Sequence, residues 1–330
     1  MGFSPQHMLL GDIGATNARL ALLSDGAVGP IHWFTVTEFA RFADAVEAFM
    51  QRHCRQLSVP EALLAVAGPV VDERCVLTNC PWTIDARELR ARFQFASVHV
   101  LNDFEATALS LPQLAAADLY PLGGGAPLAA EPMAVLGPGT GLGVACFVPG
   151  SPNSVVIASE GGHTTMAGCS SREDAVIDFL RREFGHVSAE RVVSGAGLEN
   201  LYRAVVALDA AQAPARNAAE ITKAVLDGDC PAARAALDLF CAMLGTFAGN
   251  VALMYGAKGG VYIAGGIVPR FTDFIARSQF RERFEYKGRF RSYLEAIPSS
   301  VILHPAATFL GLRSIAKRHS DAAWSASRPG

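Results

Sequence analysis

The feature that most restricts how this chain can fold is a short pattern that occurs twice in its 330 residues. Each copy is an apolar run, a glycine-rich turn and a second apolar run: LLGDIGAT (9–16) precedes apolar residues 18–23, and VLGPGTG (135–141) precedes apolar residues 144–148. Each copy predicts two strands joined by a tight turn. So loose a similarity can arise by chance, but it indicates two α/β halves of like construction, each with a hairpin turn at a common cleft. Backbone N–H groups in such turns can converge on an anion such as phosphate.

The other apolar segments predict strands and helices in alternation, which is typical of an α/β protein. Residues 39–57 carry apolar side chains at helical spacing and predict an amphipathic helix. Short apolar runs predict further strands over 63–67, 98–101 and 261–264. Longer segments with helical periodicity predict helices over 104–111, 171–183, 199–210 and 230–253. Segments rich in glycine, alanine and proline predict loops over 123–132 and 211–218.

Length and composition indicate a well-buried globular protein with two domains. Hydrophobic residues make up 51% of the chain and charged residues 18%, which argues against a disordered protein. A length of 330 residues favours two domains of ordinary size over one. We expect a small α/β domain formed by residues 1–112 and 305–330, and a large α/β domain formed by residues 113–304.

Charge and cysteine content argue against several classes of protein. The net charge is −3 and no long run of Lys and Arg is present, so we expect no nucleic-acid partner. We find no apolar stretch long enough to span a bilayer and no segment with the parts of a signal peptide, so we expect no membrane partner and a cytoplasmic location. The 7 cysteines are scattered without paired C-x-x-C motifs, which argues against zinc and fits reduced thiols.

The first glycine-rich turn, GDIGATNAR over residues 11–19, has the composition of a phosphate-binding turn. Glycine lets the backbone come close to a ligand. The carboxylate of Asp12 and the hydroxyl of Thr16 could orient a hydrated Mg²⁺ ion and a phosphate oxygen. The alternative is a plain hairpin in which Asp12 and Asn17 serve as turn formers.

Two other glycine-rich segments offer a similar surface. Residues 137–143, GPGTGLG, match neither the Rossmann fingerprint nor a P-loop, and an apolar strand follows them. Residues 259–268, GGVYIAGGIV, place glycines on both sides of a strand, and a purine ring could lie on that flat surface. The alternatives are a hairpin turn for the first segment and a strand-to-helix turn for the second.

Polar residues at three further places suit a polyhydroxyl ligand. Asn102 lies between a strand and a helix with Glu105 three residues later, which predicts a helix cap, and Asp103 at the strand end could act as a general base. Glu160 and His163, separated by two glycines, could point into one pocket and both donate and accept hydrogen bonds. The sequence of residues 188–195 favours a short helix, with Ser188 as its cap and Glu190 in its first turn.

The order and spacing of these motifs together resemble the bacterial glucokinase family, the hexokinase branch of the actin-like ATPase fold. The resemblance runs from Leu9 to about Leu312. It implies the bilobal actin-like ATPase (ribonuclease H-like) fold, with two α/β domains around a cleft. It further implies ATP-dependent phosphorylation of D-glucose at its 6-hydroxyl to give glucose 6-phosphate and ADP, the step that feeds glucose into glycolysis. ATP and Mg²⁺ would be the cofactors, and the protein would be a homodimer.

The resemblance also assigns roles to single residues. Asp103 would be the general base on the 6-hydroxyl, and Asp12 would help to position Mg²⁺ through water. The other contacts follow from the matching motifs: Asn102, Asp103, Gly141, Glu160, His163 and Glu190 for the sugar, Asp12, Gly14, Ala15, Thr16, Asn17, Gly139, Thr140 and Gly141 for the phosphates, and Gly265, Gly266 and Ile267 for the adenosine. Ala15 departs from the family, which often has a second glycine there, and the change would tighten the turn.

Three other functions fit parts of the same pattern. The first is a kinase of the same fold that acts on another hexose, an N-acetyl sugar or a carboxylate. The second is a sugar-binding regulator without catalysis, and Asp103 and the two phosphate turns argue against it. The third is a filament or chaperone ATPase, which should hydrolyse ATP without sugar. The related repressor and kinase family carries a cysteine-rich zinc motif, and this sequence has none.

Overall fold

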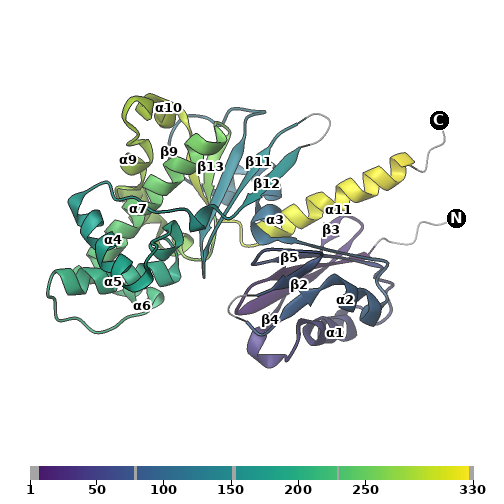
Figure 1. The fold of residues 1–330 in the computed structure, drawn as a ribbon. Coiled ribbons are helices and arrows are strands. Elements are labelled where there is room, and N and C mark those ends of the chain that lie inside the picture. Colours follow the sequence, from purple (N-terminus) through teal and green to yellow (C-terminus); the bar gives the residue numbers. More distant parts are fainter. Residues whose placement is uncertain (1–6, 78–79, 151–153, 229, 327–330) are drawn as a thin grey trace. The chain divides into compact units, whose positions relative to one another are not determined.

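The computed structural model describes residues 7–77, 80–150, 154–228 and 230–326. The chain divides into two compact units: unit 1 comprises Met1–Leu114 and Pro305–Gly330, and unit 2 comprises Ala115–His304. In the described part of the chain, each unit contains a six-stranded sheet with helices against it (Figure 1). The predicted α/β class is therefore confirmed.

The sheet of unit 1 begins with the first predicted hairpin. Strand β1 pairs antiparallel with β2 and parallel with β5, and β8 extends the parallel side. The strand order is β3-β2-β1-β5-β8, with β4 also paired to β2. The strand bounds are β1 His7–Ile13, β2 Asn17–Ser24, β3 Ala27–Val28, β4 His32–Thr35, β5 Glu61–Val66 and β8 Ser97–Asn102, and a separate ribbon pairs β6 Arg74–Val76 with β7 Thr83–Asp85.

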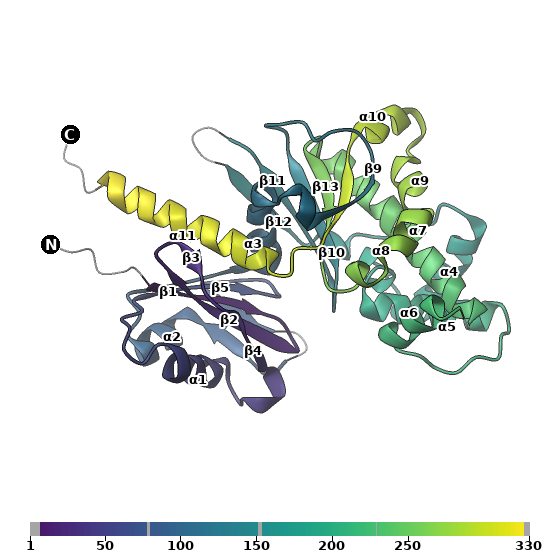
Figure 2. The same cartoon turned by 180° about the vertical axis from the view of Figure 1, so that it is seen from behind.

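Helices cover both faces of this sheet, as Figures 1 and 2 show. Alternate residues of each strand point to opposite faces. One face packs on α1 (Phe42–His53) and α2 (Ala86–Phe93), around Phe42, Phe49 and Trp82. The other face packs on α3 (Asp103–Ser110) and α11 (Ala307–Ala326). Helix α11 comes so close to α3 that a Cβ at Gly311 would overlap the Ala106 carbonyl.

The sheet of unit 2 repeats the hairpin construction. Strand β10 pairs antiparallel with β11 and parallel with β13, in the order β12-β11-β10-β13-β14-β9. The second predicted hairpin is therefore confirmed. The strand bounds are β9 Leu119–Gly123, β10 Met133–Pro138, β11 Leu142–Val148, β12 Val155–Ser159, β13 Gly260–Ile263 and β14 Ser299–Ile302.

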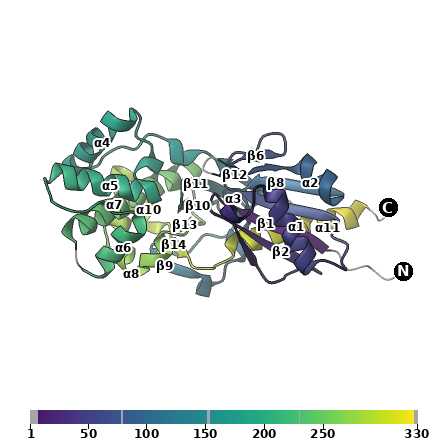
Figure 3. The ribbon, with the colours of Figure 1, turned by 90° about the horizontal axis from the view of Figure 1, so that it is seen from below.

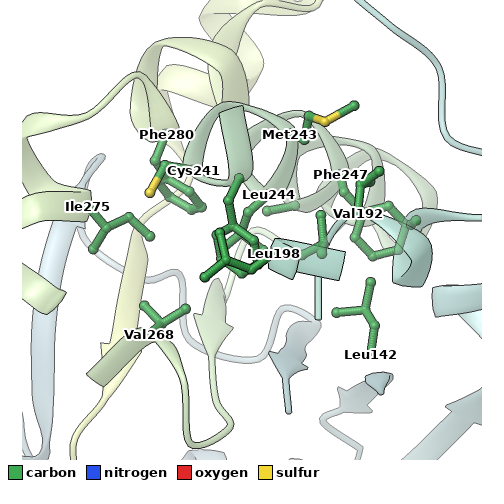
Figure 4. Close-up of a cluster of buried hydrophobic side chains, with 14 of the residues drawn as sticks. Leu142, Val192, Leu198, Cys241, Met243, Leu244, Phe247, Val268, Ile275 and Phe280 are labelled. Carbon is green, nitrogen blue, oxygen red and sulfur yellow. The ribbon is translucent and has the colours of Figure 1, made fainter. Parts of the chain in front are cut away.

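The core of unit 2 forms around a single long helix, α7 (Pro231–Tyr255). Helices α4 (Ser171–Phe184), α5 (Gly195–Leu208) and α6 (Ala218–Leu226) lie beside it (Figure 3). Buried side chains of α7, among them Leu244 and Phe247, meet Leu142 and Leu198 in one cluster (Figure 4). Three short helices, α8 Thr272–Arg277, α9 Phe280–Glu285 and α10 Arg291–Ala296, complete the unit. The prediction that no apolar stretch is long enough to span a bilayer is wrong for α7, which could cross a membrane by length and composition. However, 72% of its most apolar window is buried inside the protein, as in the core helix of a folded domain.

Several predicted boundaries are wrong. The helix predicted over residues 39–57 forms only over Phe42–His53, because residues 36–38 make a 3-10 turn and Val59 precedes a proline, which disfavours helix. The helix predicted from residue 199 begins at Gly195, where the hydroxyl of Ser194 accepts the N–H of Gly197. Several elements were not predicted, since each is short or only weakly periodic: helices α2, α6, α8, α9 and α10, and strands β3, β4, β6, β7, β9, β12 and β14.

Candidate functional site

The polar residues of unit 1 gather at one edge of its sheet. Ile13, Val66 and Asn102 are register neighbours at the carboxyl ends of the parallel strands β1, β5 and β8. The turn after Ile13 is closed by a hydrogen bond of 2.9 Å from the N–H of Gly14 to the carbonyl of Asn17. The carboxyl ends of parallel strands are where α/β proteins build ligand sites. The first glycine-rich turn and the Asn102–Asp103 pair therefore share an edge.

Asn102 is the N-cap of α3, as predicted. Its Oδ1 accepts the N–H groups of Phe104 at 2.9 Å and Glu105 at 3.4 Å, and its Nδ2 donates to the carbonyl of Gly68 at 3.2 Å. These contacts fix the orientation of the amide. Burial raises the pKa of the Glu105 carboxyl, and a hydrogen bond with the backbone of Asn102 partly offsets that increase.

Asp103 is the first residue of α3 and is half-buried. One of its carboxylate oxygens accepts the N–H of Phe104 at 3.0 Å. Burial raises the pKa of the nearby Cys75 thiol, and the negative charge of Asp103 raises it further. Asp103 is thus a carboxylate near a buried thiol at the strand edge, placed in the first turn of a helix. A general base for a hydroxyl needs this kind of fixed carboxylate.

Asp12 lies on β1 directly opposite Arg19 of β2, and the two side chains form an ion pair. Asp12 supplies a carboxylate next to the first glycine-rich turn, and Mg²⁺ is commonly held by one or two carboxylates together with substrate phosphates. Among the described residues, no group of three or more His, Cys, Asp or Glu side chains could hold a metal ion by itself.

The glycine-rich segments of unit 2 come together at the end of the second hairpin. The N–H of Gly139 donates to the carbonyl of Gly141 at 2.8 Å, and the N–H of Gly195 donates to the carbonyl of Gly139 at 2.9 Å. Gly265, at φ +86°, lies so close to β10 that a Cβ would overlap the Pro138 carbonyl. A Cβ at Gly195 would lie 3.6 Å from Cδ1 of Ile267. The second turn, the adenosine segment and the start of α5 are thus neighbours.

Three glycines in these turns have no structural reason to be glycine. A Cβ at Gly139 or Gly266 would meet nothing within 4 Å, and one at Gly14 would meet only the Asn17 carbonyl at 3.5 Å. None of the three has a φ in the left-handed region. A ligand that approaches the backbone closely would explain all three residues, because a Cβ would occupy its place. Each of the two turns, taken by itself, therefore fits a phosphate group.

Glu190 lies near Glu160 and His163 in unit 2, although it comes from a different loop. Nε2 of His163 lies 3.8 Å from Oε2 of Glu160, and its Nδ1 lies 4.0 Å from Oε1 of Glu190. The side chains of Glu160 and His163 are 67% and 61% exposed. Gly162 packs so closely on β11 that a Cβ would overlap the Leu142 carbonyl, which seats this loop against the second hairpin. The three side chains offer exposed donors and acceptors to a ligand.

The prediction for residues 188–195 is wrong in part. A short 3-10 turn, Ala189–Arg191, does form, but Ser188 makes no side-chain cap. The reason is that the loop pairs with its neighbour, since the N–H of Ala189 donates to the carbonyl of Thr164 at 2.9 Å. Glu190 instead reaches the second hairpin, where its Oε2 accepts the N–H of Leu142 at 2.9 Å.

This contact also explains Gly141, because a Cβ there would lie 2.5 Å from Oε2 of Glu190. Only the tertiary structure reveals the link between Glu190 and the glycine-rich turn. Sequence reasoning likewise assigned no role to Arg19, although its place at the end of the first motif was a signal.

Comparison with known proteins identifies the family. The sequence model of the glucokinase family matches residues 9–319. The chain is similar to the glucokinase of Paramagnetospirillum magneticum, with 46% identity over 94% of this chain and 97% of the relative. It is also similar to the glucokinase of Klebsiella pneumoniae, with 42% identity over 92% of this chain and 94% of the relative.

A solved glucokinase structure from an Antarctic psychrotroph superposes with a TM-score of 0.83 at 34% identity, covering 94% of this chain and 98% of that one. Its fold matches this chain nearly end to end, which confirms the actin-like ATPase fold. With a family model over most of its length and relatives above 40% identity, this chain belongs to the glucokinase family.

Proposed function

We propose that this protein transfers the γ-phosphoryl group of ATP to the 6-hydroxyl of D-glucose, giving glucose 6-phosphate and ADP. The observation that carries the proposal is the contact of Glu190 with the second hairpin. Its Oε2 accepts the N–H of Leu142 at 2.9 Å, while its Oε1 lies 4.0 Å from Nδ1 of His163. The Glu190 carboxylate thus connects the loop of Glu160 and His163 to the glycine-rich turn before Leu142. A kinase needs this adjacency, because its sugar and its phosphates must meet.

The sugar is held by hydrogen bonds that match its hydroxyl groups. Glu160, His163 and Glu190 supply carboxylate oxygens and ring nitrogens, and the Asn102 amide supplies a donor held in place by its cap. Each sugar hydroxyl can donate and accept, so a mixed set of this kind orients it. The backbone at Gly141 completes the proposed sugar contacts.

Asp103 is the proposed catalytic base. Its carboxylate, fixed at the start of α3, accepts the proton of the attacking 6-hydroxyl as the oxygen bonds to phosphorus. Removing a positioned base costs typically 10²–10⁴ in rate. The leaving oxygen remains on ADP, and the proton remains on Asp103 until the product departs.

The nucleotide lies along the glycine-rich turns. Gly14, Ala15, Thr16 and Asn17 contact phosphates from unit 1, and Gly139, Thr140 and Gly141 contact them from unit 2. Gly265, Gly266 and Ile267 receive the adenosine. Asp12 would hold Mg²⁺ through water, and that ion would neutralise phosphate charge. Phosphoryl transfer passes through a loose transition state, so most of the protein's contribution is positioning and charge stabilisation.

The same proposal includes the setting of the enzyme. We place it in the cytoplasm, as a homodimer in glycolysis, with domains bounded at residues 112 and 305. Light scattering across micromolar concentrations tests the dimer, and a monomer mass throughout the range would remove it.

The decisive experiment measures ADP release by a coupled assay with ATP, Mg²⁺ and a panel of sugars. We expect strong turnover with glucose, little without sugar, and none after Mg²⁺ is chelated. A preference for another hexose or an N-acetyl sugar would correct the substrate within the same fold. Sugar binding without turnover would favour the regulator, and turnover without sugar would favour an ATPase.

A further inference from the structure

Arg19, at the edge of the unit 1 sheet, makes hydrogen bonds to two residues and lies near two aromatic rings. It lies directly opposite Asp12 on one neighbouring strand and Trp33 on the other, so the three residues form a row across the sheet. Their side chains lie on the face that packs on α11, the face of Leu10 and Ala21. Arg19 is 19% exposed and Asp12 is 14% exposed.

Every nitrogen of the guanidinium has a partner. Nε donates to Oδ2 of Asp12 at 2.9 Å, and Nη2 donates to the same oxygen. Nη1 donates to the carbonyl of Pro305, the first residue of the C-terminal segment of unit 1, at 2.7 Å. A planar guanidinium with donors engaged on two sides cannot rotate without breaking hydrogen bonds.

Two aromatic rings hold the same guanidinium. Its central carbon lies 5.3 Å from the ring centroid of Trp33 and 5.6 Å from that of Phe309. Phe309 is buried near the start of α11, whereas Trp33 is 66% exposed. Cations at this distance from aromatic rings are attracted by the ring electrons. The position of Arg19 is thus fixed by residues of β1, β4 and α11 together.

The pairing with Asp12 is one-sided. Both hydrogen bonds from Arg19 end on Oδ2, and Oδ1 takes no part in the pair. One oxygen of the carboxylate is therefore neutralised and anchored, and the direction of the other oxygen is set. Such an arrangement disfavours two-oxygen capture of a bare cation and favours a single contact to a hydrated one, since Mg²⁺ keeps several of its waters.

We propose that Arg19 is a positioning residue: it orients the Asp12 carboxylate so that this group contacts Mg²⁺ only when the ion is bound together with the nucleotide. This inference rests on the proposed role of Asp12 at a Mg²⁺–ATP site. In this proposal Arg19 acts through Asp12: it holds Oδ2 of Asp12, and the two aromatic rings and the Pro305 carbonyl hold Arg19. Groups that orient a metal-binding side chain typically contribute 10–100-fold to metal affinity or activity.

The test is the Arg19→Lys variant, which keeps the charge but loses the planar two-nitrogen pairing. Calorimetry measures ADP binding with Mg²⁺ and with a chelator, and the ratio of the two dissociation constants gives the coupling between metal and nucleotide. We expect Arg19→Lys to lower this ratio by about tenfold or more, while ADP affinity in chelator stays within about twofold. The double variant with Asp12→Asn should have the same ratio as Asp12→Asn alone.

The matched control is Arg92→Lys. Arg92 also lies in unit 1, pairs with two carboxylates, those of Asp44 and Glu47, and stacks on an aromatic ring, that of Phe93. It lies on α2, against the opposite face of the sheet. Its variant should lose similar stability and keep the full coupling ratio.

Two results distinguish this inference from the proposed function. If wild-type protein phosphorylates glucose and Arg19→Lys has the coupling ratio of Arg92→Lys, this inference alone is overturned. If Mg²⁺ does not tighten ADP binding to wild-type protein at all, the proposed function fails with it. Should Arg19→Lys not fold, Trp33→Leu decides, because Trp33 is mostly exposed. A lowered ratio supports the inference, and an unchanged ratio contradicts it.

Discussion

The two hairpins at the sheet edges share one construction and differ in what they carry. In unit 1 the penultimate pair before the turn is Asp12 opposite Arg19, whereas in unit 2 it is Gly137 opposite Gly143. The first hairpin thus brings its own charges to the edge. The second has only backbone there and receives a carboxylate, that of Glu190, from a loop about fifty residues further along the chain.

This difference divides the proposed work between the units. Charged groups that must be oriented during the reaction, Asp12 and Asp103, are anchored at strand ends of unit 1. The second hairpin has only backbone groups to contact phosphates, and its nearest carboxylate, that of Glu190, comes from a loop. Side chains held by strands and helix starts are more precisely placed than side chains on loops. We therefore expect changes in unit 1 to act mainly on turnover, and changes in unit 2 mainly on binding.

The largest expected effect comes from Asp103→Asn. The variant keeps the shape of the side chain and the cap made by Asn102, so glucose affinity should be largely retained. Turnover should fall by about 10²–10⁴, as for the loss of a positioned base. If Asp103 served only the helix start, stability would fall instead, by roughly 0.5–2 kcal/mol. Measuring kcat, sugar binding and Tm on one preparation separates these cases, and near-normal kcat in a stable variant would refute the catalytic role.

The next comparison sets Gly265→Ala against Gly139→Ala. Gly265 has φ +86° and no room for a Cβ, so alanine there should cost on the order of 1–3 kcal/mol of stability. Gly139 has open space and an ordinary backbone, so alanine should leave Tm unchanged while weakening ATP binding. Denaturant unfolding and nucleotide titration measure both quantities. An unaltered ATP affinity in Gly139→Ala would count against a phosphate at the second turn.

A second pair of variants tests the Glu190 carboxylate. Glu190→Ala should raise the glucose KM and also lower stability by about 1–3 kcal/mol, because it leaves the buried N–H of Leu142 without its acceptor. Glu160→Ala removes an exposed carboxylate from the same trio, so it should raise the glucose KM with a stability change within about 0.5 kcal/mol. Equal stability losses in both variants would show that the hydrogen bond between Glu190 and the N–H of Leu142 does not contribute to stability.

The smallest expected effect is a pH dependence at Glu105. Its folded pKa is raised by burial, so its contribution to stability is present at low pH and is lost as the pH rises through that pKa. Glu105→Gln removes the titration. Relative to wild-type, the variant should gain Tm between pH 4 and pH 8. A Tm difference that is constant over this range, or larger at pH 4, would contradict the burial-driven shift.

Sequence reasoning found the local features of both edges. The hairpins followed from apolar runs around glycines, and the Asn102 cap followed from its place between a strand and a helix. These depend on residues close together in the chain, where backbone preferences decide the outcome. The short helical turn with Glu190 was predicted for the same reason and does form, but the Ser188 cap does not, and the partner of the Glu190 side chain, Leu142, lies far away in sequence.

What the sequence by itself determined is thus the class of fold, the two glycine-rich turns, the candidate residues and the family they indicate. Only the tertiary structure decided which of those residues meet. The contact of α11 with α3, the contacts of Arg19 with Pro305 and Phe309, and the hydrogen bond of Glu190 with Leu142 each join segments that are distant in the chain. The physical reason is that a strand or turn is selected by local preference, whereas contact between side chains depends on how whole elements bury their apolar faces against each other.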